Sequence, residues 1–180
     1  MISISLCLIV KNEEQTLNNC LSSVKGIPDE IIIVDTGSTD RTKEIARKWT
    51  SHVYDFEWID DFSAARNASF QYATKDYILW LDADDVLEQE QSRKLKQLKE
   101  SLSEGVDAVS MKYLMLNSEE KGITSYTTRL RLVKREKGFK WKGIVHEDLA
   151  INQAYTCLQS DICITHTKRE ILICRLHAEI

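Results

Sequence analysis

The chain has 180 residues, of which 43% are hydrophobic and 29% charged, and its net charge at neutral pH is −4. This composition predicts a globular protein with a sizeable core and excludes a disordered or fibrous chain. Acidic and basic residues are interspersed, which argues against a nucleic-acid partner and against a polybasic membrane anchor. We therefore expect a single domain over residues 1–180 that acts on a small molecule.

The cysteines and the N-terminal residues indicate the compartment. The five cysteines are odd in number and widely spaced, without a C-x-x-C pair, so free thiols in a reducing cytoplasm are the simplest interpretation. The apolar residues 1–10 lack a preceding basic region and are too short to cross a bilayer. We predict a cytoplasmic protein with neither a signal peptide nor a transmembrane segment.

The first hundred residues alternate apolar runs with amphipathic segments. Three mostly apolar runs, at 2–10, 30–35 and 77–81, and a short segment at 52–55 are predicted to be strands. Four segments with apolar residues at helical spacing are predicted to be helices, one carrying Leu17 and Leu21 and the others at 40–48, 62–73 and 90–102. This alternation predicts a mainly parallel, doubly wound α/β sheet flanked by helices.

The pattern changes after residue 105. Residues 108–116 and 127–133 alternate on either side of the polar turn 117–122, which predicts a β-hairpin with one exposed face. A last strand is expected near 161–165, and a terminal helix over 169–178. The second part of the chain is therefore expected to be richer in hairpins than the first.

Acidic residues follow two of the predicted strands. Asp35 ends the second strand, and Asp82, Asp84 and Asp85 follow the fourth. The carboxyl ends of parallel strands share one edge of a sheet, where open α/β proteins bind ligands. Asp82 and Asp84, with the small Ala83 between them, can reach one hard cation, and together with phosphate oxygens they suit Mg²⁺ or Mn²⁺ better than zinc. The alternative is a solvated turn before the next helix.

Four motifs follow one another in the first ninety residues. Residues 5–14 are an apolar strand ending in Lys-Asn-Glu-Glu, and residues 30–40 are a strand ending in Asp-Thr-Gly-Ser-Thr-Asp. Residues 62–67 read Phe-Ser-Ala-Ala-Arg-Asn, and residues 81–85 read Leu-Asp-Ala-Asp-Asp. In this order the set resembles the family 2 glycosyltransferases of the GT-A fold, the inverting type that depends on nucleotide sugars.

This resemblance is strong over residues 3–90 and moderate over 105–150. It implies a GT-A-like fold in which residues 1–104 form the nucleotide-sugar-binding half and residues 105–180 the acceptor-side half. It also implies transfer of a sugar, with a UDP-sugar as the expected donor, to an acceptor hydroxyl with inversion. A carbohydrate, a lipid-linked molecule or a protein remains open as the acceptor, and so does a homo-oligomeric state.

The resemblance also assigns residues to the donor and the metal. The nucleotide sugar is expected to bind at Val10, Asn12, Glu14, Asp35, Gly37, Arg66, Asp82 and Ala83. Asp35 would bind the base, and Asp82 would meet the ribose or the metal through water. Asp84 would bind Mn²⁺ or Mg²⁺ on the diphosphate, where the ion neutralises the charge of the departing group. His166 resembles a late metal ligand of some of these enzymes, with a purely structural histidine as the alternative.

An inverting transfer needs a base on the acceptor hydroxyl. The stretch Val145-His146-Glu147-Asp148 resembles the one that supplies it, with Glu147 as the first choice and Asp148 as the second. The alternative is that these acids cap or salt-bridge a loop. Nearby, Phe139 and Trp141 could stack on an acceptor sugar, although an isolated tryptophan more often packs in a core.

Two other functions remain open from the sequence. Around His166 the chain matches the family only at the histidine itself, so a fragment or a non-catalytic nucleotide-sugar-binding module is one alternative. Residues 82–86 also fit the Asp-x-Asp-x-Val signature of haloacid-dehalogenase-like phosphatases, in which Asp82 would be a nucleophile. That signature normally lies on the first strand, whereas here three strand units precede it.

Overall fold

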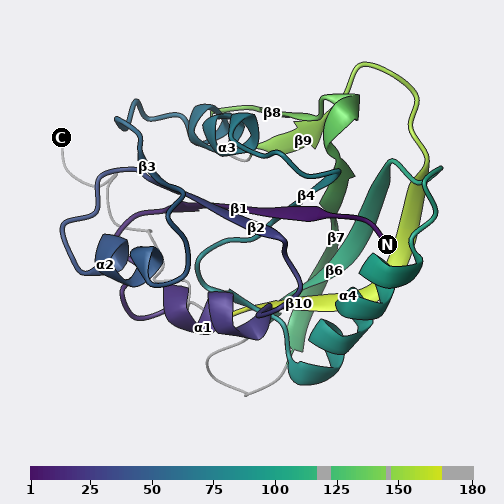
Figure 1. Cartoon of the computed structure of the whole chain (residues 1–180), viewed down its shortest axis with the longest axis horizontal. Helices are drawn as coiled ribbons and strands as arrows, with labels where there is room; N and C mark the ends of the chain where they lie inside the picture. Colours follow the sequence, from purple (N-terminus) through teal and green to yellow (C-terminus); the bar gives the residue numbers. More distant parts are fainter. Residues whose placement is uncertain (117–122, 145–146, 168–180) are drawn as a thin grey trace, which may run out of the picture.

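A computed structural model describes residues 1–116, 123–144 and 147–167. Within these ranges the chain forms an eight-stranded sheet with helices on both faces and a separate two-stranded sheet (Figure 1). The strands are β1 (Ile4–Val10), β2 (Glu30–Asp35), β3 (Val53–Asp55), β4 (Tyr77–Trp80), β5 (Asp85–Val86), β6 (Ala108–Leu116), β7 (Ile123–Lys134), β8 (Lys140–Lys142), β9 (Asp148–Ala150) and β10 (Cys157–His166). The helices are α1 (Leu17–Ser23), α2 (Thr42–Arg47), α3 (Phe62–Gln71) and α4 (Gln89–Ser101), with a short 3₁₀ helix, η1, at Arg135–Lys137.

The strand order in the large sheet is β3-β2-β1-β4-β7-β6-β10-β5. Strands β3, β2, β1 and β4 are parallel, β7 is antiparallel to both β4 and β6, β10 is parallel to β6, and β5 is antiparallel to β10. This confirms the predicted mainly parallel α/β sheet and the hairpin of its second part. Strand β7 begins earlier than predicted, and the expected terminal helix lies outside the described residues.

Three short strands were not predicted. Strands β5, β8 and β9 have two or three residues each. Such lengths contain less than two full alternations of side chains, so they produce no recognisable period in the sequence. Strand β5 pairs with β10, and β8 pairs with β9.

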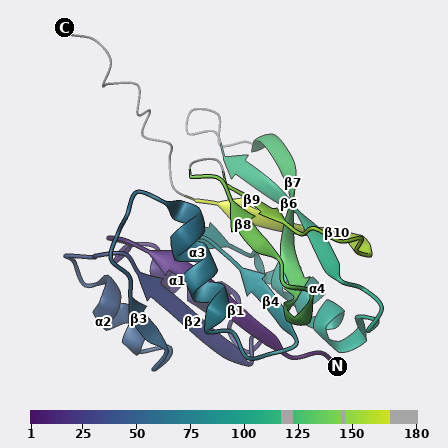
Figure 2. The same ribbon diagram turned by 90° about the horizontal axis from the view of Figure 1, so that it is seen from above.

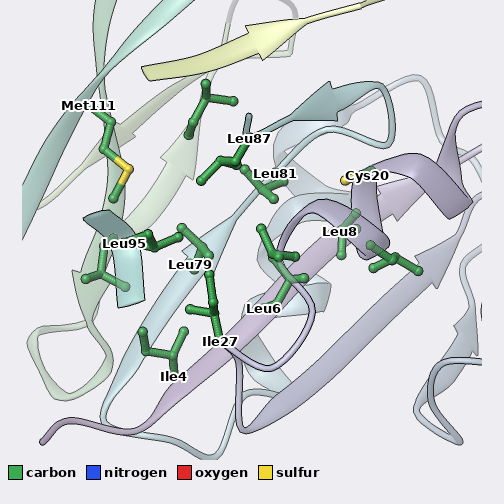
Figure 3. Close-up of a cluster of buried hydrophobic side chains, with 14 of the residues drawn as sticks. Ile4, Leu6, Leu8, Cys20, Ile27, Leu79, Leu81, Leu87, Leu95 and Met111 are labelled. Carbon is green, nitrogen blue, oxygen red and sulfur yellow. The ribbon is translucent and has the colours of Figure 1, made fainter. Parts of the chain in front are cut away.

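The two faces of the sheet carry separate apolar cores because side chains alternate along each strand. On β1, Ile4, Leu6 and Leu8 point to one face, where they meet buried residues of α1 and α4 such as Cys20 and Leu95 (Figure 3). On the other face the intervening Cys7 packs with buried residues of β2, β4, β6 and β7. The continuous apolar run of β1 is therefore explained by burial on both sides.

Helices α1, α2 and α4 cover one face of the sheet and α3 covers the other (Figures 1 and 2). The small sheet of β8 and β9 lies beside α3, joined to it by Asn67. The Asn67 side chain donates to the carbonyl oxygen of Trp141 at 3.0 Å and accepts from the Trp141 N–H at 2.9 Å. Among the helices of the described residues, none has the length and hydrophobicity that crossing a bilayer requires.

The carboxyl ends of the central strands lie at one edge of the sheet. Val10 at the end of β1 is paired in register with Asp35 at the end of β2. On the other side of β1, the N–H of Leu81 donates to the carbonyl oxygen of Cys7. The acids that follow β2 and β4 are therefore at the same edge, as the sequence predicts.

Candidate active site

Residues 82–85, here called the acidic loop, form a tight turn that Asp85 closes. The N–H of Asp85 donates to the carbonyl oxygen of Asp82 at 3.0 Å, and the N–H of Asp82 donates to Asp85 Oδ2 at 2.9 Å. Asp85 is fully buried and Asp84 is largely buried, whereas Asp82 is half-buried. The three carboxylates therefore have different surroundings although they are close in sequence.

Arg66 of α3 joins the acidic loop to a residue far along the chain. Its Nη2 donates to Asp82 Oδ1 at 2.6 Å, and its Nε donates to Glu147 Oε1 at 2.7 Å. The guanidinium carbon lies 5.0 Å and 4.8 Å from the ring centroids of Trp80 and Trp141, within the range of cation–π attraction. Burial raises the pKa of the Asp82 carboxyl, but the charges of Arg66 and Arg131 and the hydrogen bond from Arg66 together lower that pKa below its usual value. Asp82 is therefore ionised at neutral pH.

Asp84 lies opposite His166, the last residue of β10. His166 Nδ1 is 3.4 Å from Asp84 Oδ1, 3.7 Å from Asp85 Oδ1 and 2.8 Å from the Tyr113 hydroxyl oxygen. The nearby carboxylates of Asp84 and then of Asp85 raise the pKa of His166 to about 10. In the metal-free protein the imidazole is therefore protonated at neutral pH.

The same three residues could hold a metal ion. One ligand atom from each of Asp84, Asp85 and His166 lies within 4.8 Å of the other two. Carboxylate oxygens combined with one imidazole nitrogen suit Mn²⁺, and with added water or phosphate oxygens they suit Mg²⁺. Asp82 does not belong to this group, so its predicted contact with the metal stays a prediction.

Two cavities meet at the acidic loop. The smaller has a volume of about 390 Å³, and its lining includes Val10, Thr36 and Ala83. The larger has a volume of about 830 Å³, and its lining includes Tyr113, Trp141, Glu147, Asp148 and His166. Four residues line both cavities: Phe62, Arg66, Asp82 and Asp84. Two molecules bound in the two cavities would therefore meet at the acidic loop.

The predicted nucleotide-binding residues of the first two loops are not among the lining residues of either cavity. Asn12 Oδ1 accepts from the N–H of Thr39 at 2.8 Å, and Glu14 Oε2 accepts from the N–H of Arg41 at 3.1 Å. These bonds tie the loop after β1 to the loop after β2. In this structure the two side chains hold the rim of the smaller cavity in shape, and their contact with a nucleotide stays a prediction.

Asp35 shapes the second of these loops and retains one unused acceptor. Its Oδ1 accepts from the N–H groups of Gly37 and Ser38 at 2.9 and 2.8 Å. Gly37 has a φ of +104°, a conformation that favours glycine. Asp35 Oδ2 is buried and has no hydrogen-bond partner among the described residues. A buried acceptor without a partner is costly. Asp35 is not among the lining residues of either cavity, so its contact with a base stays a prediction.

The two candidate bases differ in their surroundings. The Glu147 side chain is 15% exposed and is bound to Arg66, whereas the Asp148 side chain is 82% exposed and lies 3.2 Å from Arg129 Nη1. Both line the larger cavity. Val145 and His146 lie outside the described residues, so the structure says nothing of that part of the motif.

Phe139 and Trp141 are both buried. Phe139 belongs to the core beneath α3, and Trp141 packs edge-on against Trp80 with ring centroids 4.6 Å apart. Both rings therefore pack in the core, and Trp141 also lines the larger cavity.

Arg131 of β7 and Tyr113 of β6 are site residues that the sequence analysis missed. Arg131 Nη1 donates to Asp85 Oδ2 at 2.8 Å, and Tyr113 contacts His166. Each lies in a strand of alternating residues where a polar or aromatic side chain is ordinary. The signal that could have identified Arg131 is its position between Leu130 and Leu132, in a strand predicted to have one buried face. The sequence alone does not show whether the Arg131 side chain lies on the buried or on the exposed face.

Residues 5–157 match the model of a protein family described as Glycosyl transferase family 2. Among curated proteins, the chain is 37% identical over 148 residues to a TPR repeat-containing protein of Synechococcus elongatus. It is 33% identical over 150 residues to the SPbeta prophage-derived glycosyltransferase SunS of Bacillus subtilis. These alignments cover 82% and 81% of this chain but 35% and 34% of the relatives. The chain thus spans about a third of the length of these curated relatives.

Similar solved structures include glucosyl-3-phosphoglycerate synthase from Mycobacterium tuberculosis in complex with Mn²⁺ and UDP-glucose. Its TM-score is 0.64 at 16% identity, with 94% of this chain and 73% of that chain covered. S. aureus TarS (residues 1–349) in complex with UDP-GlcNAc has a TM-score of 0.59 at 16% identity, with 88% and 59% covered. At these identities the likeness concerns the fold alone, and it confirms the expected GT-A arrangement.

Proposed function

The chain belongs to glycosyl transferase family 2, and we propose that it transfers a sugar from a nucleoside-diphosphate donor to an acceptor hydroxyl with inversion and with the help of a divalent metal ion. The donor we propose is a UDP-sugar. The observation that carries this proposal is the position of the acidic loop, whose Asp82 and Asp84 line both cavities at the carboxyl edge of the sheet.

The smaller cavity is the proposed donor site. It lies at the ends of β1 and β2, and the buried Asp35 Oδ2 nearby has an unused acceptor for an N–H group of the base. The similar structures with UDP-glucose and Mn²⁺ and with UDP-GlcNAc support a UDP-sugar as the donor. Asp84 and His166 are the proposed metal ligands, and a bound Mn²⁺ or Mg²⁺ would stabilise the negative charge that grows on the leaving diphosphate.

The larger cavity is the proposed acceptor site, with Glu147 as the base. Transfer forms a bond between the acceptor oxygen and the anomeric carbon of the sugar while the bond from that carbon to the diphosphate breaks. Glu147 would take the proton of the acceptor hydroxyl, and Arg66 orients its carboxylate through the 2.7 Å hydrogen bond. Arg66 also lines the smaller cavity, so it connects the two proposed sites.

A non-catalytic nucleotide-sugar-binding module is the second candidate. The observation that favours it is that the carboxylate of Glu147, the proposed base, is already occupied by Arg66. Donor binding without transfer to any acceptor would support it. The phosphatase alternative has lost its support, because the family that matches is a glycosyl transferase family.

The first test is a calorimetric titration with UDP in the presence and absence of Mn²⁺, with GDP as the control for the base. UDP is expected to bind at least about tenfold more tightly with Mn²⁺ than with EDTA, because the ion offsets repulsion between the diphosphate and the acidic loop. GDP is expected to bind more weakly than UDP. Binding to neither nucleotide would contradict the proposed function.

Metal binding is expected to depend on pH through His166. The imidazole carries a proton below its pKa of about 10 in the metal-free protein, and a metal ligand must lose that proton. Mn²⁺ affinity should therefore rise with pH, by about tenfold for each unit between pH 6.5 and 8.5. Calorimetric titration with Mn²⁺ at several pH values measures this slope.

His166→Gln is expected to weaken Mn²⁺ binding and to flatten the slope. The matched control is His52→Gln, since His52 is an exposed histidine that does not line either cavity. If Mn²⁺ affinity depends on pH in the same way after His166→Gln, His166 is not a metal ligand.

A further inference from the structure

We infer that Arg131 is a positioning residue that neutralises Asp85 and keeps this carboxylate out of the metal coordination sphere, so that Asp84 and His166 are the protein ligands of the ion. The inference rests on the proposed function and deepens it. It assigns different roles to two neighbouring carboxylates of the acidic loop: Asp84 binds the ion, whereas Asp85 pairs with Arg131 and does not bind it.

Arg131 and Asp85 form a fully buried ion pair. Their side chains are 1% and 0% exposed, and Arg131 Nη1 lies 2.8 Å from Asp85 Oδ2. The guanidinium carbon is 3.8 Å from the ring centroid of Trp80 and 4.5 Å from that of Tyr113. These two rings leave the guanidinium little freedom, which fixes the position of the charge opposite Asp85.

The charges of the acidic loop are distributed unequally. Arg66 pairs with Asp82, and Arg131 pairs with Asp85. Asp84 has no guanidinium partner among the described residues; its neighbour is His166, whose proton an ion can replace. Of the three carboxylates, Asp84 is therefore the one whose charge remains available to a cation.

The cavities point to the same assignment. Asp84 and His166 line the larger cavity, whereas Asp85 lines neither cavity. An ion that arrives with a diphosphate in the smaller cavity would meet Asp84, which lines both cavities, and His166 faces Asp84 from the larger one. Asp85 Oδ2 is already occupied by Arg131 and by the N–H of Asp82.

Removal of Arg131 would change this arrangement in a defined direction. Asp85 Oδ1 has no hydrogen-bond partner among the described residues and lies 3.7 Å from His166 Nδ1. Without the guanidinium, Asp85 would be a buried, unpaired carboxylate beside the metal site, and such a group attracts the nearest cation. The ion would then bind more tightly and with one more protein ligand, which leaves fewer positions for the phosphate oxygens of the donor.

The deciding experiment is a titration of the nucleotide-free protein with Mn²⁺, read by electron paramagnetic resonance of the unbound ion. The central variant is Asp85→Asn/Arg131→Met, which removes both charges while Asn keeps an acceptor for the N–H of Asp82. Its Mn²⁺ affinity is expected to stay within about threefold of the unsubstituted protein. Arg131→Lys, which keeps the charge, is expected to behave in the same way, whereas Arg131→Met is expected to bind Mn²⁺ at least about tenfold more tightly.

The outcomes separate this inference from the proposed function. A double variant that folds but binds Mn²⁺ at least about tenfold more weakly would show that Asp85 is itself a ligand, and would overturn the inference. A double variant that does not fold, judged by circular dichroism and thermal unfolding, would also overturn it, in favour of a structural role for the pair. Absence of Mn²⁺ binding by the unsubstituted protein would instead overturn the proposed function and the inference together.

Discussion

Asp84→Asn is expected to lower the affinity for UDP in the presence of Mn²⁺ at least about tenfold, or about 1.4 kcal/mol, so that it falls toward the metal-free value, while metal-free UDP binding does not weaken. The reason is that Asp84 is the proposed carboxylate ligand of the ion and has no guanidinium partner among the described residues. An amide oxygen in its place carries no net charge and binds a hard cation weakly. Isothermal titration with and without Mn²⁺ measures both affinities.

The fold should survive this substitution. The acidic loop is attached to β10 through the main chain of Asp84, whose carbonyl oxygen accepts from the N–H and the hydroxyl of Thr167 at 3.0 and 2.6 Å. The matched control is Asp161→Asn, which removes an exposed carboxylate of β10 that pairs with Lys94. If Asp84→Asn leaves the metal-dependent affinity for UDP intact, Asp84 is not a ligand of the ion.

Glu147→Gln is expected to reduce sugar transfer at least about a thousandfold and to leave UDP affinity within about threefold. The glutamine oxygen can still accept from Arg66 Nε, so the geometry of the site is kept while the proton acceptor is lost. The measurement is the turnover of a UDP-sugar with an active acceptor, together with a UDP titration of the same preparation. Loss of transfer and loss of donor binding in parallel would point to a structural role instead.

Asp148→Asn is the matched control for the base. Asp148 is the neighbouring acid, lines the same cavity and is largely exposed beside Arg129. If Glu147 is the base, Asp148→Asn should retain most of the activity. The reverse result, with full activity in Glu147→Gln and none in Asp148→Asn, would move the assignment to Asp148.

The first part of the fold could be predicted from the sequence because its signals are local. Strands β1, β2 and β4 are mostly apolar, and each ends in or is followed within two positions by polar or acidic residues. Parallel strands connected by helices have one handedness and one shared carboxyl edge, so the position of Asp35 near the acidic loop follows from the order of the elements.

The partners of the acidic loop could not be predicted, because they come from distant strands. Asp85 and Arg131 are 46 positions apart, and Arg66 and Glu147 are 81 positions apart. Which residue of β7 lies opposite Asp85 depends on register shifts in the pairing with β6, and a shift of one residue turns a side chain to the other face. The sequence shows that charged residues are present, but not which of them are paired.

Strands β4 and β5 are separated by only four residues in the chain, yet β7, β6 and β10 lie between them in the sheet. Neighbouring strands are about 4.8 Å apart, so a flat sheet would place β4 and β5 about 19 Å apart, more than the roughly 17 Å that the connecting residues span when fully extended. The sheet must therefore curl, and the acidic loop closes this curl by connecting β4 to β5.

This closure has a consequence for the order of folding. The loop is held in place by β10, through the pairing of His166 with Asp85 and the bond from Thr167 to Asp84. These contacts span about eighty residues, so the entropy of closing that long loop must be overcome before they form. During synthesis the parallel strands can assemble as they emerge, whereas the contacts of the acidic loop with β10 can form only after residue 167 has been made.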